Sequence, residues 1–314
     1  MLAAFLTKDG FSLREERQPE IGDNQLLIQT LGCGICGGDQ HTYKVRKEAV
    51  TDGELFLGHE GTGTVVAIGG DVSGFSEGDL VTSLGGGFAD YFVANAEELV
   101  KVPDNVDPLL ALGEPVACCV HAVDRIHICP GDKVAILGCG FMGLVCLQLA
   151  KIAGAGEIVA LDPMPYRREM ALELGASTAF APSDYKMPDP DIGEFDVVIE
   201  AAGNQPVIDD ATDMVRQHGK VVLVGYHESL DGMRQINMKR WNFKAIDVLN
   251  GHVRRDDEKL SAMRKGMQLL SSGQLQLDKL VSLYPLTNIE QAFSDIFEAE
   301  KEVFKIVLQP TPSN

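Results

Sequence analysis

The feature that most constrains the fold is a glycine motif set between a short apolar run and a helical stretch. Gly138, Gly140 and Gly143 follow the β-prone run 133–137 with the spacing G-x-G-x-x-G. The first glycine allows a tight turn, the second lets the backbone approach a pyrophosphate, and the third lets helix and strand pack closely. A second apolar run, 158–161, follows the helical stretch. This order predicts a parallel strand–helix–strand unit.

An acidic residue completes the pattern of a dinucleotide site. Asp162 closes the second apolar run, nineteen residues after Gly143, and a carboxylate there accepts hydrogen bonds from the adenosine ribose. The N–H groups at the start of the helix, at Phe141 and Met142, are expected to face the phosphates. Because Asp162 would repel the additional phosphate of NADP, NAD is the predicted cofactor, although Arg167 could reduce that repulsion. A turn that serves only the fold is the alternative.

The alternation of strands and helices continues along the chain. Strands are predicted at 197–200, followed by Gly203, and at 220–225, ending at Gly225. We assign both glycines to the cofactor-binding edge of the sheet. Strands that lack strict polar–apolar alternation and are separated by helices imply a doubly wound parallel sheet covered on both faces. Further predicted elements are helices at 169–174 and 209–217 and a strand at 243–249.

The N-terminal part of the chain has a different texture, in which short β-prone segments between turn residues predict a compact β lobe. Residues 1–6 lack the basic region and apolar core of a signal peptide and are interpreted as the first strand. Near the C-terminus we predict a helix at 256–270, a second one opened by a capping box at 287–290, and a closing strand at 304–308. The β-prone segments of the N-terminal part are 25–29, 61–68, 79–82 and 89–93.

Composition limits the partners and the compartment. The chain has 46 acidic and 27 basic residues and a formal net charge of −19, so its surface should repel nucleic acid and anionic membranes. Its apolar runs are far shorter than the roughly 20 residues that a membrane-spanning helix needs. Seven cysteines without an export signal argue against a disulfide framework and favour the cytoplasm.

Three polar clusters in loops suggest a metal site. The stretch GCGICGGDQH contains Cys33 and Cys36, and a C-x-x-C pair serves either redox chemistry or zinc binding. Catalytic zinc sites use thiolate, imidazole and carboxylate ligands and leave one position open. The residues that offer these groups are Cys36, His59, Glu60 and Glu114. A redox thiol pair and a plain glycine turn stay open as alternatives.

Four motifs occur in a fixed order along the chain. They are GCGICGGDQH at 32–41, GHEGTG at 58–63, the Glu-Pro step at 114–115 and the glycine motif at 138–143. So arranged, the chain resembles the zinc-dependent medium-chain dehydrogenases, particularly the polyol (sorbitol-type) and threonine dehydrogenase branch. The resemblance implies the α/β class, with a GroES-like β-rich catalytic domain and a Rossmann doubly wound parallel-sheet domain. The implied domains are 1–116 (GroES-like), 117–252 (NAD-binding Rossmann) and 253–314 (return to the catalytic domain).

The resemblance also implies roles for individual residues. Cys36, His59 and Glu60 would bind one catalytic zinc ion. Glu114 would be a further ligand or the acceptor for the zinc-bound water. His41 would end a proton relay or contact the cofactor ribose, with a plain loop histidine as the alternative. The histidines interpreted as packing or surface residues, because they lack ligand spacing, are His121, His127, His218, His227 and His252.

Two features depart from the pattern of that family. No cysteine lies between Cys36 and Cys118, so the loop that binds a structural zinc in many members is predicted to be absent. Gly38 stands where the family commonly has serine or threonine, so one hydroxyl of the proton relay is missing. A water molecule or Glu114 would have to stand in for it.

The implied activity is oxidation of a secondary alcohol to a ketone, or the reverse, with hydride transfer to NAD. Zinc would act as a Lewis acid on the alcohol oxygen. Polyols, sugar alcohols and amino alcohols all suit this branch as small-molecule substrates. The alternatives are a zinc-free alkene or quinone reductase on the same architecture and a non-catalytic NAD-binding regulatory protein. Relatives imply a homo-oligomer, either a dimer or a tetramer.

Overall fold

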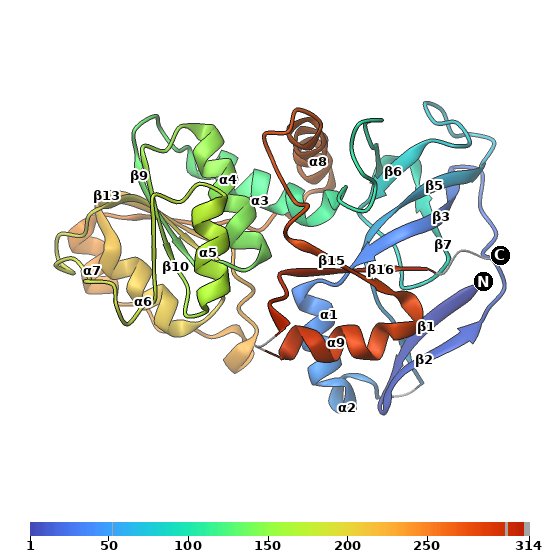
Figure 1. Ribbon diagram of the computed structural model, residues 1–314, viewed down its shortest axis with the longest axis horizontal. Helices are drawn as coiled ribbons and strands as arrows, with labels where there is room; N and C mark the ends of the chain where they lie inside the picture. Colours follow the sequence, from blue (N-terminus) through green and yellow to red (C-terminus); the bar gives the residue numbers. More distant parts are fainter. Residues whose placement is uncertain (52, 299–300, 311–314) are drawn as a thin grey trace. The chain divides into compact units, whose positions relative to one another are not determined.

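The computed structural model describes residues 1–51, 53–298 and 301–310. The chain divides into two compact units (Figure 1). One unit comprises Met1–Ala117 and Met263–Asn314, and the other comprises Cys118–Ala262. Among the described residues, no helix is long and apolar enough to cross a membrane.

The unit Cys118–Ala262 is built on a six-stranded sheet of order β11-β10-β9-β12-β13-β14, in which every neighbouring pair is parallel. Strand β9 is central, and the chain order reverses between β10 and β12 on its two sides. This arrangement confirms the predicted parallel sheet and the α/β class. The strands are β9 (Lys133–Leu137), β10 (Glu157–Leu161), β11 (Thr178–Phe180), β12 (Phe195–Glu200), β13 (Val215–Leu223) and β14 (Asp247–Asn250).

Helix α4 (Phe141–Ala153) shows why the glycine motif is followed by a helix. Its apolar run is buried from Gly143 through Ala150 because the helix packs against β9, β10 and β12. Gly154 ends the helix in a left-handed conformation with φ 102°, which glycine adopts without a steric penalty. The other helices are α3 (Gly113–Ile126), α5 (Pro165–Glu173), α6 (Gln205–Met214), α7 (Met238–Lys244) and α8 (Asp256–Ser271), with a 3-10 turn at Ser229–Gly232.

The other unit contains a seven-stranded sheet of order β15-β16-β3-β5-β6-β8, with β7 paired to β3, and a three-stranded sheet β2-β1-β4. Strand β16 near the C-terminus pairs antiparallel with β3, with Val307 opposite Gly34. Strand β16 therefore lies beside the strand that leads into Cys36. The strands are β1 (Leu2–Thr7), β2 (Gly10–Glu15), β3 (Gln25–Gly34), β4 (Leu55–Phe56), β5 (Glu60–Ile68), β6 (Leu80–Ser83), β7 (Tyr91–Asn95), β8 (Leu99–Lys101), β15 (Val281–Pro285) and β16 (Lys305–Gln309).

This β-rich unit has two buried apolar clusters. One lies between β3, β16 and helix α9 (Ile289–Phe297), and the other lies between β3, β5, β6 and β7. Phe88 and Phe293 are fully buried and pack edge to face, with ring centroids 6.2 Å apart. The remaining short elements are α1 (Gly37–Lys44), α2 (Arg46–Ala49) and the 3-10 turns Ala96–Glu98 and Leu286–Asn288. Cys36 is the N-cap of α1, His59 directly precedes β5, and Glu114 lies in the first turn of α3.

Several predicted elements of the parallel-sheet unit are wrong in their bounds. The helix predicted at 169–174 is part of α5, which begins at Pro165, and the strand predicted at 220–225 overlaps β13, which begins at Val215 and ends at Leu223. The helix predicted at 209–217 begins earlier, because Asn204 accepts a hydrogen bond from the Val207 N–H at 3.2 Å and so caps α6. It ends at Met214, since Val215 already belongs to β13. The strand predicted at 243–249 is shorter, because α7 extends to Lys244 and strand β14 starts only at Asp247.

The capping box predicted at 287–290 is also wrong, although a helix does follow. Residues Leu286–Asn288 form a 3-10 turn, and α9 starts at Ile289 without a side-chain cap. The Glu290 carboxylate instead accepts hydrogen bonds from the Phe11 N–H and from the Tyr43 hydroxyl. The Glu290 side chain therefore bonds to β2 and α1 and not to the backbone at the start of its own helix.

Candidate functional site

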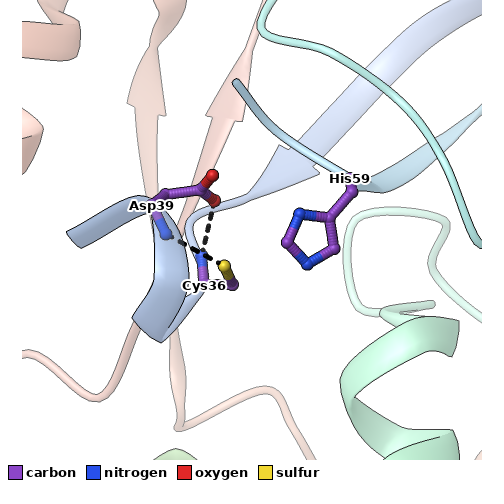
Figure 2. A group of neighbouring side chains, drawn as sticks. All are labelled: Cys36, Asp39 and His59. Carbon is purple, nitrogen blue, oxygen red and sulfur yellow. Dashed lines mark hydrogen bonds between the residues drawn. The ribbon is translucent and has the colours of Figure 1, made fainter. Parts of the chain in front are cut away.

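Cys36 lies at the N-terminus of helix α1, just after strand β3. The Asp39 N–H donates to Cys36 Sγ at 3.2 Å, and the Cys36 N–H donates to Asp39 Oδ2 at 3.0 Å. This reciprocal pair caps the helix and fixes the position of the sulfur. Figure 2 shows the sulfur on the side of α1 that faces the His59 imidazole.

The surroundings of Cys36 disfavour a thiolate unless a cation is present. Burial raises the pKa of the Cys36 thiol, and the negative charges of Asp39 and Glu60 raise it further. A bound divalent cation reverses this balance, because a coordinating thiol is deprotonated. The site is therefore electrostatically suited to a metal ion.

Glu60 begins strand β5 and is 2% exposed. Lys305 Nζ lies 2.6 Å from Glu60 Oε1 and also donates to the Ile35 carbonyl at 3.0 Å. Burial raises the pKa of the Glu60 carboxyl, and the Lys305 ammonium opposes that shift. Burial alone would lower the pKa of Lys305, but the Glu60 charge outweighs it and raises the pKa. Lys305 is thus an ammonium ion held against a buried carboxylate.

One oxygen of that carboxylate has spare acceptor capacity. Lys305 Nζ lies 2.5 Å from Glu60 Oε2 as an ion pair, yet in the described part of the chain Oε2 receives no bond with hydrogen-bond geometry. Buried polar atoms are nearly always satisfied. A buried carboxylate oxygen without a directed donor can act as a ligand to a bound cation.

The predicted ligands come together in two overlapping groups. Ligand atoms of Cys36, Asp39 and His59 lie within 4.8 Å of one another, and so do those of His59, Glu60 and Glu114. Tetrahedral zinc with bonds of about 2.0–2.3 Å separates its ligands by about 3.3–3.8 Å, so a small contraction suffices. His59 belongs to both groups, so the two groups adjoin at its imidazole. Thiolate, imidazole and carboxylate donors suit zinc.

The other residues assigned near the metal lie differently. His41 is half-buried on α1 and belongs to neither group of ligand atoms in the described part of the chain. Cys33 is 1% exposed, and burial raises the pKa of its thiol. All seven cysteines are free thiols, so Cys33 and Cys36 are not joined here.

The glycine motif forms an open cradle at the carboxyl end of β9. Gly138 has φ +96°, and a Cβ on Gly143 would overlap the Gly138 carbonyl oxygen. A Cβ on Gly140 would meet no atom of the described residues within 4 Å, and Gly140 gives α4 no side-chain cap. The position beside Gly140, directly before α4, is therefore open space. This geometry fits a pyrophosphate.

Asp162 ties the cradle to the end of β10. Its side chain is 2% exposed, and it accepts hydrogen bonds from the Cys139 N–H and the Met164 N–H, both at 2.8 Å. Arg167 NH1 lies 3.8 Å from Asp162 Oδ2. The carboxylate therefore sits beside the glycine turn, with one backbone donor on each oxygen.

Gly203 and Gly225 meet at the carboxyl ends of β12 and β13. Gly203 has φ +73°, a Cβ there would overlap Tyr226, and a Cβ on Gly225 would overlap Gly203. The two turns thus touch through their backbones. This contact requires glycine at both positions.

Four polar residues in or near these sites received no role from the sequence, and a fifth, His227, was interpreted as a packing or surface residue. Asp39 lies within the motif at 32–41 and was given no role. Lys305 is a charged residue in the otherwise apolar closing strand 304–308, and such a charge can be recognised from the sequence. Glu200 closes an apolar run in the same way as Asp162. The five residues are Asp39, Lys305, Glu200, His227 and Arg234.

Comparisons with known proteins agree with this architecture. Residues 22–104 match the family model of the alcohol dehydrogenase GroES-like domain, and residues 142–272 match that of the zinc-binding dehydrogenases. A β-rich GroES-like unit and a parallel Rossmann sheet together make the architecture of medium-chain dehydrogenases.

Individual relatives cover most of the chain. An L-threonine 3-dehydrogenase of Alteromonas mediterranea is 30% identical over 253 residues, covering 69% of this chain and 74% of the relative. The sorbitol dehydrogenase of Bacillus subtilis strain 168 is 28% identical over 93% of this chain and 92% of its own length. The chain belongs to the zinc-type medium-chain dehydrogenase family.

Solved structures show the same fold over the whole length. A Sinorhizobium meliloti 1021 protein described as a zinc-binding dehydrogenase, bound to NADP, has a TM-score of 0.88 with 27% identity, covering 98% of this chain and 99% of that one. The 2R,3R-butanediol dehydrogenase of Bacillus subtilis has a TM-score of 0.84 with 27% identity, covering 99% of both chains.

Proposed function

We propose that the protein is a zinc-dependent, NAD-linked dehydrogenase that interconverts a secondary alcohol and its ketone. The observation that carries this proposal is the convergence of Cys36, His59, Glu60 and Glu114 in two groups of ligand atoms that share His59. Similar proteins are named for D-arabinitol, sorbitol and L-threonine, and each of these compounds carries a secondary hydroxyl group. The substrate class is therefore a polyol, a sugar alcohol or an amino alcohol.

The residues that would hold the catalytic zinc are Cys36, His59, Glu60 and Glu114. When bound, zinc supplies Lewis-acid chemistry that lowers the pKa of an alcohol hydroxyl. Asp39 caps α1 and thereby orients the Cys36 sulfur. Lys305 holds the Glu60 carboxylate in place and supplies one of its counter-charges. One zinc per chain is expected, because no cysteine between Cys36 and Cys118 offers a structural site.

The cofactor would lie along the carboxyl edge of the parallel sheet. The turn from Gly138 to Gly143 and the first N–H groups of α4 would receive the pyrophosphate. Asp162 would accept from the adenosine ribose and favour NAD over NADP. When bound, the dinucleotide supplies the hydride acceptor. Gly203 and Gly225 would border its nicotinamide half.

Proton release requires a route that the chain supplies only in part. Gly38 carries no hydroxyl, and the atom of a described residue within 4 Å of a Cβ placed there is Cys36 Sγ, at 3.4 Å. The space is therefore open to water, which could connect the substrate to His41. We assign His41 to this route or to the cofactor ribose.

Metal analysis combined with a substrate screen tests the proposal. Purified protein should contain about one zinc per chain and should reduce NAD with at least one member of a polyol and amino-alcohol panel. Loss of a residue that supports a metal ligand typically lowers metal affinity or activity by about 10–100-fold. Cys36 is proposed as a direct ligand, so Cys36→Ser should lower zinc affinity and activity by more than this. Cys129→Ser is the matched control, since Cys129 is exposed and outside both ligand groups.

Two results would reject the proposal. Full activity after exhaustive chelation would favour a zinc-free reductase on the same architecture. Zinc and NADH binding without turnover of any alcohol or ketone would instead favour a regulatory role.

The free state of all seven cysteines supports a reducing compartment such as the cytoplasm. A homo-oligomer, either a dimer or a tetramer, is expected in size-exclusion chromatography.

A further inference from the structure

A buried carboxylate closes strand β12 at the edge of the parallel sheet. Glu200 is fully buried, and its Oε1 accepts hydrogen bonds from the Ala202 N–H at 2.8 Å and the Gly203 N–H at 2.6 Å. Its other oxygen, Oε2, lies 3.0 Å from His227 Nε2. Glu200 thus fixes the turn after its own strand and reaches the segment after β13.

The state of His227 follows from its second partner. Arg234 Nε lies 3.0 Å from His227 Nδ1, and a guanidinium group can only donate hydrogen bonds. Nδ1 must therefore accept, so the imidazole is neutral and carries its hydrogen on Nε2. That hydrogen is donated to Glu200. The imidazole is fixed from both sides in one tautomer.

Arg234 completes the connection and has no donor left for a ligand. NH1 donates to the carbonyls of Ser229 and Met233, each at 2.7 Å. NH2 donates to the Gly203 carbonyl at 3.0 Å and to Ser229 Oγ at 3.1 Å. With the bond to His227, all five guanidinium N–H groups are used. Arg234 therefore joins the segment 229–234 to the Gly203 turn.

The position of this network in the sheet suggests what it serves. The glycine cradle follows β9 and Asp162 follows β10. Glu200 ends β12 and His227 lies after β13, on the opposite side of β9. A dinucleotide lies across the carboxyl edge of such a sheet, at the point where the strand order reverses. If the adenosine half lies over β9 and β10, the nicotinamide half falls over β12 and β13.

We propose that Glu200, His227 and Arg234 are positioning residues that hold the turns at Gly203 and Gly225 in the conformation that receives the nicotinamide end of the cofactor. A buried charged group is seldom retained for stability alone, because a well-packed apolar replacement is often as stable. A fully satisfied polar network does select one conformation. The inference rests on the proposed function, since it presumes an NAD site.

Two ligands that differ in the nicotinamide ring separate this role from a general structural one. NADH carries the ring, whereas ADP-ribose has the same adenosine, pyrophosphate and second ribose without it. Isothermal titration calorimetry on the full-length protein gives the dissociation constant of each. The quantity of interest is the ratio of the two affinities.

Two substitutions break the network in different ways. His227→Leu removes both ring contacts. Glu200→Gln turns one carboxylate oxygen into an amide NH2. In either orientation of the amide this NH2 faces a donor, which is the Nε2–H of His227 or the N–H groups of Ala202 and Gly203. Each should weaken NADH binding by about tenfold, as expected for an unpaired buried polar group, and should leave ADP-ribose binding within about twofold.

A conservative variant and a matched control complete the design. His227→Gln keeps one donor toward Glu200 and one acceptor toward Arg234, so it should restore NADH binding to near the wild-type value. Arg216→Met breaks an ion pair of 2.7 Å to Asp196. Asp196 lies at the amino end of β12, the strand that ends at Glu200. It should leave the ratio unchanged.

The outcomes are distinguishable. An unchanged NADH-to-ADP-ribose ratio in folded Glu200→Gln and His227→Leu protein, checked by circular dichroism, overturns the inference. So does failure of His227→Gln to restore binding, because a neutral donor–acceptor side chain would then be insufficient. If His227→Leu does not fold, Glu200→Gln and His227→Gln carry the test. Wild-type protein that binds neither ligand rejects the proposed function instead.

Discussion

The proposed metal site and the proposed dinucleotide cradle are built in opposite ways. The metal site depends on side chains from four separate stretches of the chain, around Cys36, His59, Glu114 and Lys305. The cradle depends on the absence of side chains within one continuous turn, from Gly138 to Gly143. Charged groups define the first site, and bare backbone defines the second.

This difference determines how each site is held in shape. Buried charges at the metal site must compensate one another, because an unpaired ion in a protein interior is costly. Glu60 therefore needs Lys305, and each is almost fully buried. The cradle needs only close backbone contacts and one carboxylate, Asp162, to fix its turn. The two regions should consequently fail under different substitutions.

The largest effect is expected when a buried lysine of the metal site is removed. Lys305→Met leaves Glu60 buried without its counter-charge, and breaking such a pair typically costs about 3–5 kcal/mol of unfolding free energy. Because zinc would supply a positive charge to Glu60, the metal should recover more stability in this variant than in the wild type. Urea unfolding with and without zinc measures both quantities.

A buried lysine of the parallel-sheet unit provides the control. Lys244 is 1% exposed, but it donates to the carbonyls of Pro190, Thr212 and Asp213 and has no carboxylate partner among these contacts. Lys244→Met should lower stability by about 1–3 kcal/mol, independently of zinc. If Lys305→Met unfolds like the wild type without zinc, the charge argument for the metal site is wrong.

The next largest effect concerns the cradle. A Cβ on Gly143 would overlap a backbone carbonyl, which cannot move aside as a flexible side chain could. Gly143→Ala should weaken NADH binding by about 100-fold, in line with the strain of overpacking, and should lower the melting temperature. Gly140→Ala should weaken binding without lowering the melting temperature, because no described atom lies within 4 Å of the new methyl group.

Zinc content decides whether the two sites are independent. Both glycine variants should retain the zinc of the wild-type protein, since the predicted ligands belong to the other unit. Loss of zinc in Gly140→Ala, or equal NADH binding in all three proteins, would contradict the contrast drawn between the sites.

The sequence predicted the cradle better than it predicted the surroundings of the metal. Local order suffices for a strand, a glycine turn and a helix, and β9, α4 and β10 all lie where the pattern placed them. The proposed metal ligands could be named from three motifs, and they stay a prediction. Their supporting residue Lys305 could not, because it meets Glu60 from 245 positions away.

The same reasoning explains the errors in the predicted elements. The capping box at 287–290 failed because Glu290 bonds to Phe11 and Tyr43, two residues near the other end of the chain. The strand predicted at 243–249 failed locally, since Ala245 adopts a left-handed conformation with φ 46° that no pattern of apolar residues reveals. Prediction from local sequence fails where a side chain bonds to a residue far away in the chain, or where the backbone adopts an unusual φ angle.

The smallest predicted effect tests the one side chain on which the cradle relies. Asp162→Ala removes the acceptor of the Cys139 and Met164 N–H groups and the expected partner of the ribose hydroxyls. NADH binding should weaken about tenfold, the value of one or two hydrogen bonds to a charged group. The affinity for NADPH should fall less, or should rise. In the wild type the Arg167 guanidinium lies 3.8 Å from the Asp162 carboxylate, and in the variant it would be left to attract the additional phosphate.

Titrating NADH and NADPH into both proteins measures this change as a ratio. Asp247→Ala is the matched control, since Asp247 is an exposed aspartate at the amino end of β14 in the same sheet. A ratio that stays constant in Asp162→Ala would mean that the carboxylate serves only to fix the glycine turn. Only backbone groups of the cradle would then contact the cofactor, and the proposal that Asp162 selects NAD would be wrong. The contrast with the metal site, which depends on side chains, would be complete.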